Sequence, residues 1–278
     1  MIAREAPSRL VLLGHPVAHS LSPLFQNAAL EACGLPQRYD ALDVSPNDLP
    51  ALLSQLRSER AAGNVTLPHK GDVWALAKRR SSVAERAGAV NTFWFDEGEL
   101  VGHNTDVSGV QAAIAALLPS GVRGARCTLL GAGGSAAAVL VALDMLGCRD
   151  IRVWTRTPSR IEKLAAQTAV RVLACESVDD AVRDASLVVN ATPVGLQDNA
   201  MPVSPMAVAP DAAVLDLVYR REETAWVRSC RAHGITAEDG LRVLVEQGAA
   251  AFSCWFGRDA PRDAMWAALS HVRAVQGS

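Results

Sequence analysis

Residues 127–160 have the sequence CTLLGAGGSAAAVLVALDMLGCRDIRVWTRTPSR, and this stretch is the strongest indication of the fold. Cys127–Leu130 is a short apolar run that ends at the glycine cluster Gly131–Gly134, and Ser135–Leu146 is almost wholly apolar. A second apolar run, Ile151–Trp154, follows it. The alternation predicts a strand, a glycine turn, a buried helix and a second strand, the unit from which parallel α/β sheets are built.

The glycine cluster has two interpretations. Gly131 and Gly133 permit a tight turn and let the backbone approach a diphosphate, whose charge suits the N–H groups at a helix start. Gly134 is a further small residue, and Ala136 occupies the third small position, where helix and strand pack closely. Glycine clusters also close ordinary strand-to-helix turns, so the pattern alone is weak. Its position between a strand and a helix favours a nucleotide site.

The second strand ends without an acidic residue. A site for NAD usually places an Asp or Glu there, which accepts a hydrogen bond from the ribose 2′-hydroxyl. This chain has Arg156 and Arg160 instead, with hydroxyls on Thr155 and Thr157. Guanidinium groups and hydroxyls suit a 2′-phosphate dianion. Two arginines near a helix start can also be solvated surface charge, but the missing acid favours NADP(H) as the cofactor.

Composition limits the class of protein. The 278 residues are 50% hydrophobic and 20% charged, with a net charge of -2, which is typical of a globular protein. There is no basic stripe for nucleic acid or for a membrane surface. No apolar run approaches ~20 uncharged residues, as a membrane span requires. The segment 1–9 carries Arg4, Glu5 and Arg9 and lacks the apolar core of a signal peptide, so we expect a cytoplasmic protein.

Cysteines and histidines show no pattern of a metal site. The six cysteines are scattered without a CxxC pair, so reduced thiols are expected. His15 and His19 are four residues apart, but Pro16 lies between them and favours a loop. We therefore expect no bound metal.

The N-terminal part of the chain begins with a predicted strand, Leu10–Leu13, followed by a loop that carries Ser20 and Ser22. A helix is expected from Pro23. Ser22 could simply cap this helix, whereas Ser20 has no such explanation and could bind a carboxylated or polyhydroxylated ligand. The residues expected largely on one helix face are Leu24, Phe25, Ala28, Ala29 and Ala32.

The alternation of strands and helices continues through residue 78. We expect a strand at 39–44, a helix at 46–57, a strand at 63–66 and a helix from Lys70 to Lys78. Lys70 follows Pro68 at a strand-to-helix junction, the edge where open α/β sheets bind ligands. A lone lysine is normally a solvated surface residue, but this one has polar neighbours.

Residues 89–105 predict a hairpin, with an acidic turn at 96–99. A helix is expected from 107 to 117. Asp106 could cap this helix, yet Asn91 and Asp106 stand at segment ends in the same relation to the sheet as Lys70. A Lys–Asp pair can supply the proton that reduction of a ketone needs at its oxygen.

These motifs together resemble the shikimate dehydrogenase family from about Leu10 to Phe256. The resemblance rests on Ser20-Leu-Ser22-Pro23, Asn64-Val-Thr66-Leu-Pro-His-Lys70, Ala89-Val-Asn91-Thr92, Asn104-Thr-Asp106, Gly131-Ala-Gly-Gly134 and Asn190-Ala-Thr192. It implies reversible reduction of 3-dehydroshikimate to shikimate by NADPH, in the pathway to chorismate and the aromatic amino acids. Quinate or aminoshikimate dehydrogenases of the same family, and a non-catalytic NADPH-sensing module, remain alternatives.

The resemblance also implies roles for individual residues. Lys70 would be the acid/base, assisted by Asp106, and the partner would be a small-molecule substrate. The implied substrate ligands are Ser20, Ser22, Thr66, Lys70, Asn91, Asp106, Tyr219 and Gln247. The implied cofactor ligands are Gly131, Ala132, Gly133, Gly134, Ser135, Thr155, Arg156, Thr157, Arg160, Thr192, Leu217 and Gly240.

Some positions differ from the pattern of the family. Thr155 stands where Asn is common, and Arg220-Arg221 follow Tyr219 where a proline-containing turn is common. Arg242-Val243 replaces a frequent Gly-Met after Gly240-Leu241, which puts a bulky cation close to the implied nicotinamide site.

The C-terminal third completes the expected α/β fold of two domains. Strands are expected at 187–190 and 214–218, and a last helix at 261–275. We expect a substrate domain at 1–106, completed by 241–278, and a Rossmann-like NADP domain at 107–240. The sequence leaves monomer and homodimer open. The residues expected in the core of the helix after Gly240 are Leu241, Leu244, Val245, Gly248, Phe252, Trp255 and Phe256.

Overall fold

The computed structural model describes residues 6–166 and 168–274, and the chain forms two compact units. Unit 1 comprises Met1–Thr105 and Val245–Ser278, and unit 2 comprises Asp106–Leu244. Unit 2 is thus inserted into unit 1 along the chain. Each unit is built on its own mostly parallel six-stranded sheet, so the expected two-sheet α/β fold is confirmed.

The sheet of unit 1 has the strand order β2-β1-β3-β5-β6-β4. β1 pairs in parallel with both β2 and β3, whereas β3–β5 and β5–β6 are antiparallel. The hairpin expected within 89–105 is therefore present, and its strands span 92–103. The strands are β1 (Leu10–Gly14), β2 (Tyr39–Asp43), β3 (Ala62–Val65), β4 (Arg79–Arg80), β5 (Thr92–Asp96) and β6 (Glu99–His103).

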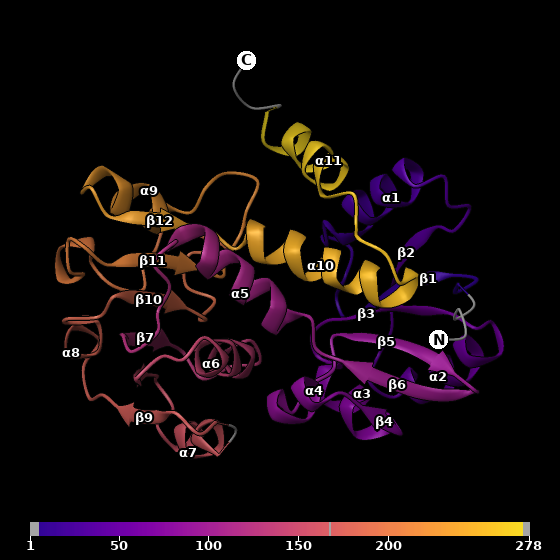
Figure 1. Ribbon diagram of the computed structural model, residues 1–278, viewed down its shortest axis with the longest axis horizontal. Coiled ribbons are helices and arrows are strands. Elements are labelled where there is room, and N and C mark those ends of the chain that lie inside the picture. The colour runs from indigo at the N-terminus through magenta and orange to yellow at the C-terminus, as the bar shows by residue number, and fades with distance from the viewer. Residues whose placement is uncertain (1–5, 167, 275–278) are drawn as a thin grey trace. The chain divides into compact units, whose positions relative to one another are not determined.

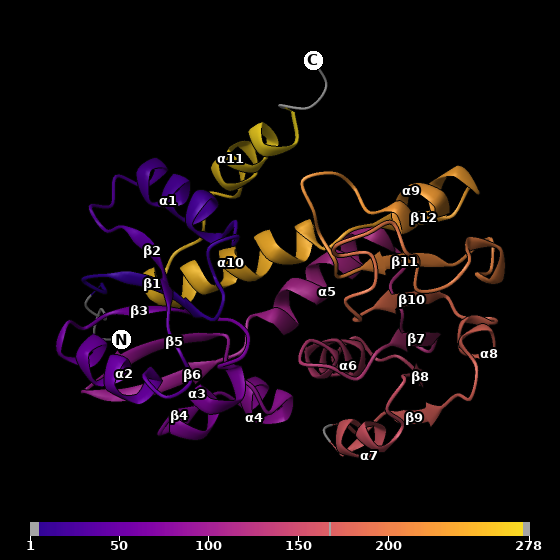
Figure 2. The same ribbon diagram turned by 180° about the vertical axis from the view of Figure 1, so that it is seen from behind.

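Helices of unit 1 cover apolar side chains of this sheet. One core cluster joins Leu13, Leu56, Val65, Val73 and Phe93, all at most 1% exposed. α1 and α11 lie side by side, as both views show (Figures 1 and 2). The helices are α1 (Ser22–Ala32), α2 (Leu49–Ser58), α3 (Lys70–Leu76), α4 (Ser82–Ala87) and α11 (Arg262–Ala274), together with α10 (Leu241–Phe256), which crosses the boundary between the units.

The sheet of unit 2 is wholly parallel, in the order β12-β11-β10-β7-β8-β9. Figure 2 shows β8 between β7 and β9. In chain order this is the doubly wound arrangement in which strand order reverses between β7 and β10. The strands are β7 (Arg126–Leu130), β8 (Asp150–Trp154), β9 (Arg171–Ala174), β10 (Leu187–Asn190), β11 (Ala213–Asp216) and β12 (Thr236–Glu238).

The helix after the glycine turn is buried almost throughout. Its residues Ala136 to Leu143 are all buried, which explains why this segment lacks a polar face. A helix apolar on every side is the signature of a central position. The helices of unit 2 are α5 (Asp106–Leu117), α6 (Ala136–Met145), α7 (Ser159–Ala165), α8 (Val178–Val182) and α9 (Ala225–Ala232), with a 3₁₀ turn η1 (Pro205–Ala207).

The buried face of α1 differs from the one expected. Leu24 is 43% exposed, whereas Gln26 is fully buried and its Nε2 donates to the carbonyl oxygen of Gly248 at 2.9 Å. The prediction failed because it assigned the inward positions to apolar side chains alone. An amide with a buried backbone partner can occupy such a position as well. The buried residues are Ser22, Phe25, Gln26, Ala29 and Leu30.

Several boundaries also differ from those expected. α2 begins at Leu49 and not at 46, because Ser45 and Asp48 form a turn in which the Ser45 hydroxyl donates to the Asp48 carboxylate at 2.7 Å. β11 ends at Asp216 and not at 218. The last helix is described to Ala274, and the expected final residue, Val275, lies outside the described residues.

Candidate active site

The turn that carries Lys70 is held by backbone hydrogen bonds at the carboxyl end of β3. Thr66 N–H donates to Leu13 O at 2.8 Å, and the carbonyl oxygen of Lys70 accepts from Val90 N–H at 2.9 Å. Lys70 is the first residue of α3 and is half-buried. The main chain at Thr66 and Lys70 is therefore fixed by the neighbouring strand and by the segment before β5.

His69, between Pro68 and Lys70, was not among the expected site residues. Its ring is fully buried, and its Nε2 bonds the carbonyl oxygen of Val44 at 2.8 Å. This contact ties the start of α3 to the end of β2. His69 thus holds the backbone beside Lys70 without facing solvent.

Asn91 and Gln247 meet inside unit 1 although they are far apart in the sequence. Asn91 Nδ2 donates to Gln247 Oε1 at 3.2 Å and to Thr105 Oγ1 at 3.0 Å, and Thr105 N–H donates to Asn91 Oδ1 at 2.7 Å. Gln247 is only 8% exposed. The structure therefore brings together two of the expected substrate residues and adds Thr105, which precedes Asp106.

A second set of buried polar residues is hydrogen-bonded to the main chain of Asn91. Tyr39 OH donates to Asn64 Oδ1 at 2.8 Å, and Asn64 Nδ2 donates to Asn91 O at 3.1 Å and to Thr92 Oγ1 at 3.0 Å. Burial raises the pKa of Tyr39, which keeps its hydroxyl a donor. Asn64 and Thr92 stood within the quoted motifs, but no role was expected for them. A polar residue inside a predicted strand was the signal in the sequence that could have identified them.

Ser20, and not Ser22 as the sequence favoured, has the hydroxyl that bonds a backbone amide at the start of α1. Ser20 Oγ accepts from Ser22 N–H at 3.2 Å, at the start of α1, and no side chain caps that helix from its N-cap residue, Leu21. Ser22 is buried, with 6% of its surface exposed. The hydroxyl that satisfies a helix-start amide is thus on Ser20, which was expected to lack a structural explanation.

In unit 2 the glycine turn lies at the point where strand order reverses. Gly131 follows β7 with φ of +103°, and a Cβ there would lie 2.9 Å from Thr192 Cγ2 and 3.1 Å from Ala191 O. Position 131 therefore requires glycine for both conformation and space. Thr192 comes from the turn after β10, so the β7 and β10 turns face each other.

These turns line a cavity of about 240 Å³. Eight expected cofactor residues line it, and so do several that the sequence did not indicate. Trp154, Ala191, Pro193 and Val194 follow or end strands, so the rule of carboxyl strand ends could have found them. Met201 and Pro202 return through a long loop and carried no local signal. The expected residues here are Gly131, Ala132, Gly133, Thr155, Arg156, Thr157, Arg160 and Thr192.

Arg156 and Arg160 are exposed at this cavity. Within the described part of the chain, neither is joined to an acidic side chain by an ion pair. Thr155 Oγ1 accepts from Thr157 N–H at 3.3 Å, which closes the turn between strand and helix. Two guanidinium groups and two hydroxyls at one rim can bind a phosphate dianion.

Four expected cofactor residues do not line this cavity. Gly134 and Ser135 lie at the start of α6, and Leu217 and Gly240 lie beyond β11 and β12. Leu217 and Gly240 are in contact, since a Cβ at Gly240 would be 2.2 Å from Leu217 O. The structure therefore unites this pair beside the cavity, since Leu217 N–H donates to the carbonyl oxygen of Asn190 at 2.9 Å, directly before Ala191 of the cavity wall.

The remaining expected residues belong to unit 2. Asp106 is the first residue of α5 and belongs to unit 2, directly after Thr105 of unit 1. Tyr219 follows β11 in unit 2, and burial raises its pKa. Arg242, expected near the nicotinamide, donates through Nε to both carboxylate oxygens of Glu238, at 2.8 and 3.0 Å.

The buried carboxyl group of Asp216 is hydrogen-bonded to Asn190, the last residue of β10. Burial raises the pKa of Asp216 to about 6, although hydrogen bonds from Thr224 and Asn190 oppose this shift. Asn190 Nδ2 donates to Asp216 Oδ1 at 2.8 Å, and Thr224 Oγ1 donates to Asp216 Oδ2 at 2.8 Å. A buried carboxylate is tolerated when donors satisfy both of its oxygens.

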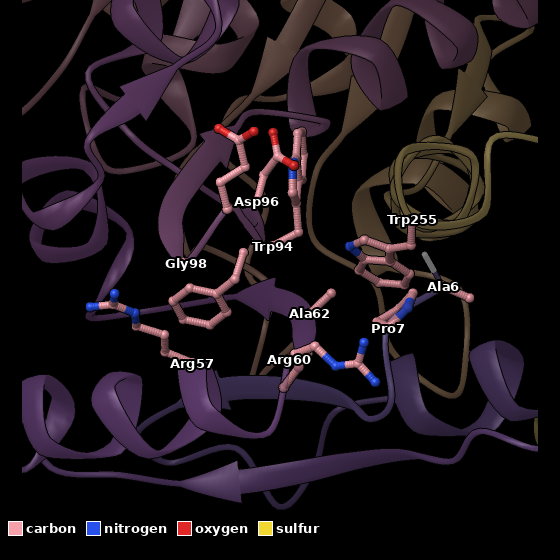
Figure 3. Close-up of a pocket in the computed structure, with 12 residues that line it drawn as sticks. Ala6, Pro7, Arg57, Arg60, Ala62, Trp94, Asp96, Gly98 and Trp255 are labelled. Atoms are coloured by element: carbon pink, nitrogen blue, oxygen red, sulfur yellow. The ribbon is translucent and has the colours of Figure 1, made fainter. Parts of the chain in front are cut away.

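Figure 3 shows another cavity, of about 270 Å³, in unit 1. It lies at the opposite end of β3 from Thr66, beside Ala62 and the β5–β6 turn. Arg60, Trp94 and Trp255 line it. None of the expected site residues lines it. Its charge is mixed, because Arg57 and Arg60 line it together with Asp96 and Glu97.

Residues 6–166 and 168–274 contain no group of three or more His, Cys, Asp or Glu side chains arranged to hold a metal ion. Nor do they contain a helix that is both long and apolar enough to cross a membrane.

Family models match three parts of the chain. The shikimate dehydrogenase substrate binding domain matches residues 12–93, and the shikimate 5'-dehydrogenase C-terminal domain matches residues 240–269. A model of the ornithine cyclodeaminase/mu-crystallin family matches residues 109–207, which include the glycine turn. The last match lies wholly in unit 2.

Whole-chain comparisons extend this likeness. A Mesorhizobium japonicum protein named shikimate dehydrogenase (NADP(+)) is 38% identical over 257 residues, which are 91% of this chain and 92% of the relative. The crystal structure of shikimate dehydrogenase from Aquifex aeolicus has a TM-score of 0.88 at 31% identity and covers 94% of this chain and 97% of its own.

A second solved structure is described with both ligands bound. It is shikimate 5-dehydrogenase from Thermus thermophilus in complex with NADP(H) and shikimate, with a TM-score of 0.86 at 39% identity over 95% of this chain and 99% of its own. The resemblance that the motifs indicated is confirmed. With identity above 30% across nine-tenths of its length, the chain belongs to the shikimate dehydrogenase family.

Proposed function

We propose that the chain is an NADP-dependent oxidoreductase that interconverts 3-dehydroshikimate and shikimate. Membership of the family supports the reaction. The observation that supports NADP as the cofactor is the cavity of unit 2, where the turn at Gly131, a position without room for a side chain, meets two arginines and no acid. NADPH would supply the hydride, and the protein would supply position and charge.

Unit 2 is proposed to hold the dinucleotide. The N–H groups of the turn at Gly131 would bind the diphosphate, and Arg156 and Arg160 would bind the 2′-phosphate. The close approach of Gly131 to Thr192 and Ala191 supports this assignment, because it packs the main chain of the turn against another wall of the same cavity. Gly134, Ser135, Leu217 and Gly240 remain proposed ligands by family likeness alone.

Unit 1 is proposed to bind the substrate. Its carboxylate would bind Ser20 and Ser22, assisted by Tyr219, and its ring hydroxyls would bind Thr66, Asn91 and Gln247. The Asn91–Gln247 hydrogen bond supports this, because two amides held together keep donors and acceptors in a fixed arrangement.

Lys70 is proposed to give its proton to the alkoxide that forms at the substrate carbonyl, and Asp106 to orient Lys70 or the hydroxyl. The tethered backbone on both sides of Lys70 supports this role, since an acid must be positioned before it can transfer a proton. A cytoplasmic location is proposed because the cysteines at 33, 127, 148, 175, 230 and 254 are free thiols.

The first test is the initial rate of shikimate oxidation with NADP and with NAD. Rapid reduction of NADP would support both the chemistry and the arginine rim, provided that kcat/KM for NAD is at least about tenfold lower than kcat/KM for NADP. A preference for NAD would reject the arginine rim and keep the enzyme. Specificity constants for quinate and aminoshikimate, measured beside shikimate, would identify the substrate within the family. Dinucleotide binding without turnover on any of the three would indicate a sensing module.

A further inference from the structure

The loop after β10 forms one wall of the cofactor cavity in two separate pieces. Residues 191–194 and 201–202 line the cavity, whereas residues 195–200 between them do not. The position of this wall therefore depends on what holds the intervening part of the loop.

Two tight turns make up that intervening part. Leu196 N–H donates to Pro193 O at 3.1 Å, and Ala200 N–H donates to the Asp198 carboxylate at 3.0 Å. Gly195 has φ of +84°, and a Cβ there would lie 3.0 Å from Ala200 O. The two turns are thus packed closely, but the hydrogen bond that closes each turn lies within that turn.

Arg220 joins the two turns. Its Nη1 donates to the carbonyl oxygen of Gly195 at 3.2 Å, in the first turn, and also to the carbonyl oxygen of Asp198, in the second. The residue is half-buried and stands four positions after Asp216, the end of β11. Charged donors make stronger hydrogen bonds than neutral ones, and the planar guanidinium fixes the angle between its bonds.

The beginning of the same loop is held from the same segment. Asn190 Oδ1 accepts from Thr192 N–H at 3.0 Å and from Thr192 Oγ1 at 2.6 Å, while Asn190 Nδ2 donates to Asp216. The segment 216–220 therefore binds the loop at its start and at its middle.

We propose that Arg220 is a positioning residue for the dinucleotide, which acts by holding the cavity wall formed by residues 191–202. The inference rests on the proposed function of this cavity as the NADP site. Arg220 does not line the cavity, so it acts through the loop and not as a ligand of the phosphates.

Binding measurements on the full chain test the proposal. Arg220→Gln should raise the Kd of NADP and of NAD by the same factor of about ten. The reason is that loss of a hydrogen bond to a charged group changes an equilibrium constant by on the order of ten- to a hundredfold. Arg160→Gln should raise the Kd of NADP alone. Arg221→Gln removes the same charge from the exposed neighbouring residue and should leave both Kd values unchanged.

Hydrogen exchange supplies a readout that does not depend on any ligand. In Arg220→Gln the amides of residues 194–200 should exchange faster, while those of β10 and β11 should keep the wild-type rate. If Arg220→Gln does not fold, Arg220→Lys serves instead and should raise both Kd values by a smaller, equal factor. Unchanged Kd values in a folded Arg220 variant would overturn the proposal.

Two further outcomes would also overturn it. Weaker binding of NADP alone would show that Arg220 is a phosphate ligand. An equal rise of both Kd values in Arg221→Gln would show that Arg220 contributes only through net charge. If the wild-type chain binds neither dinucleotide, the proposed function itself fails, whereas faster exchange at residues 194–200 would still show that Arg220 holds the loop.

Discussion

Lys70 is the residue on which the proposed chemistry most depends. Its carbonyl oxygen accepts from Val90 N–H, and its neighbour His69 is buried against Val44, so the backbone around the ammonium group is well tethered. Lys70→Met keeps most of the side-chain volume and removes the proton donor. We expect kcat to fall by about 10²–10⁴, because that is the range that a positioned acid contributes.

The control for this variant is Lys78→Met. Lys78 is an exposed lysine just beyond α3, so its loss should leave kcat unchanged. Calorimetry should find the same NADPH affinity in all three proteins. Weaker NADPH binding in Lys70→Met would show instead that Lys70 is a cofactor ligand.

Asp216 should give the stability of the chain a specific dependence on pH. Burial raises its pKa from an ordinary 3.8 to about 6, so between these values the folded state holds a proton that the unfolded state releases. The folded state therefore loses stability as pH rises through this window. From pH 5 to pH 7 the expected loss is about 1 kcal/mol.

Asp216→Asn removes this ionisation. Urea denaturation of both proteins at pH 5 and pH 7 measures the difference, which should shift in favour of the variant at the higher pH. An equal difference at the two pH values would mean that Asp216 does not change its protonation state on folding within this range.

At the scale of elements, the pairing of β1 with β3 leaves no room for a side chain at Gly63. A Cβ there would lie 2.0 Å from the carbonyl oxygen of Val11, and the main chain of a central strand cannot move away cheaply. Gly63→Ala should therefore lower the free energy of unfolding by about 3 kcal/mol or more, as overpacking against backbone does.

Gly71→Ala is the matched control, because nothing lies within 4 Å of a Cβ at this position in α3. It should be neutral or stabilising, by up to about 1 kcal/mol, since alanine favours a helix more than glycine does. Thermal melting of the two variants beside the wild type decides the point, and equal melting temperatures would refute the argument from β1–β3 packing.

At the scale of the whole molecule, the proposed ligands belong to different units. NADP should slow hydrogen exchange chiefly in unit 2, at β7, β8 and β10, whose ends line the cavity. Shikimate should slow it chiefly in unit 1, at β3 and β5. A ligand at a hundred times its Kd stabilises the folded state by about 2.7 kcal/mol, which is ample for detection.

Each ligand is the control for the other in this experiment, which mass spectrometry of peptides can follow. Protection by NADP concentrated in β1, β2 and β3 would contradict the assignment of the cofactor to unit 2. Protection by shikimate confined to unit 2 would contradict the assignment of the substrate to unit 1.

The sequence by itself determined the α/β class, the glycine turn and the absence of an acid after β8, because these features are local. An apolar period, a Gly at positive φ and a charge at a strand end depend on a few neighbouring residues. The same local logic found Arg156 and Arg160, and it found Lys70 and Asn91 at the ends of their segments.

Only the tertiary structure decided which distant residues meet. Asn91 bonds Gln247, Asn190 bonds Asp216, and Arg220 bonds the loop at 195–198, and each contact joins segments that strand order or helix packing brings together. The sequence also misjudged α1, where Gln26 and not Leu24 turns inward, because its amide has a partner on α10. Periodicity measures how apolar a position is, whereas a buried polar side chain depends on the partner that the fold provides.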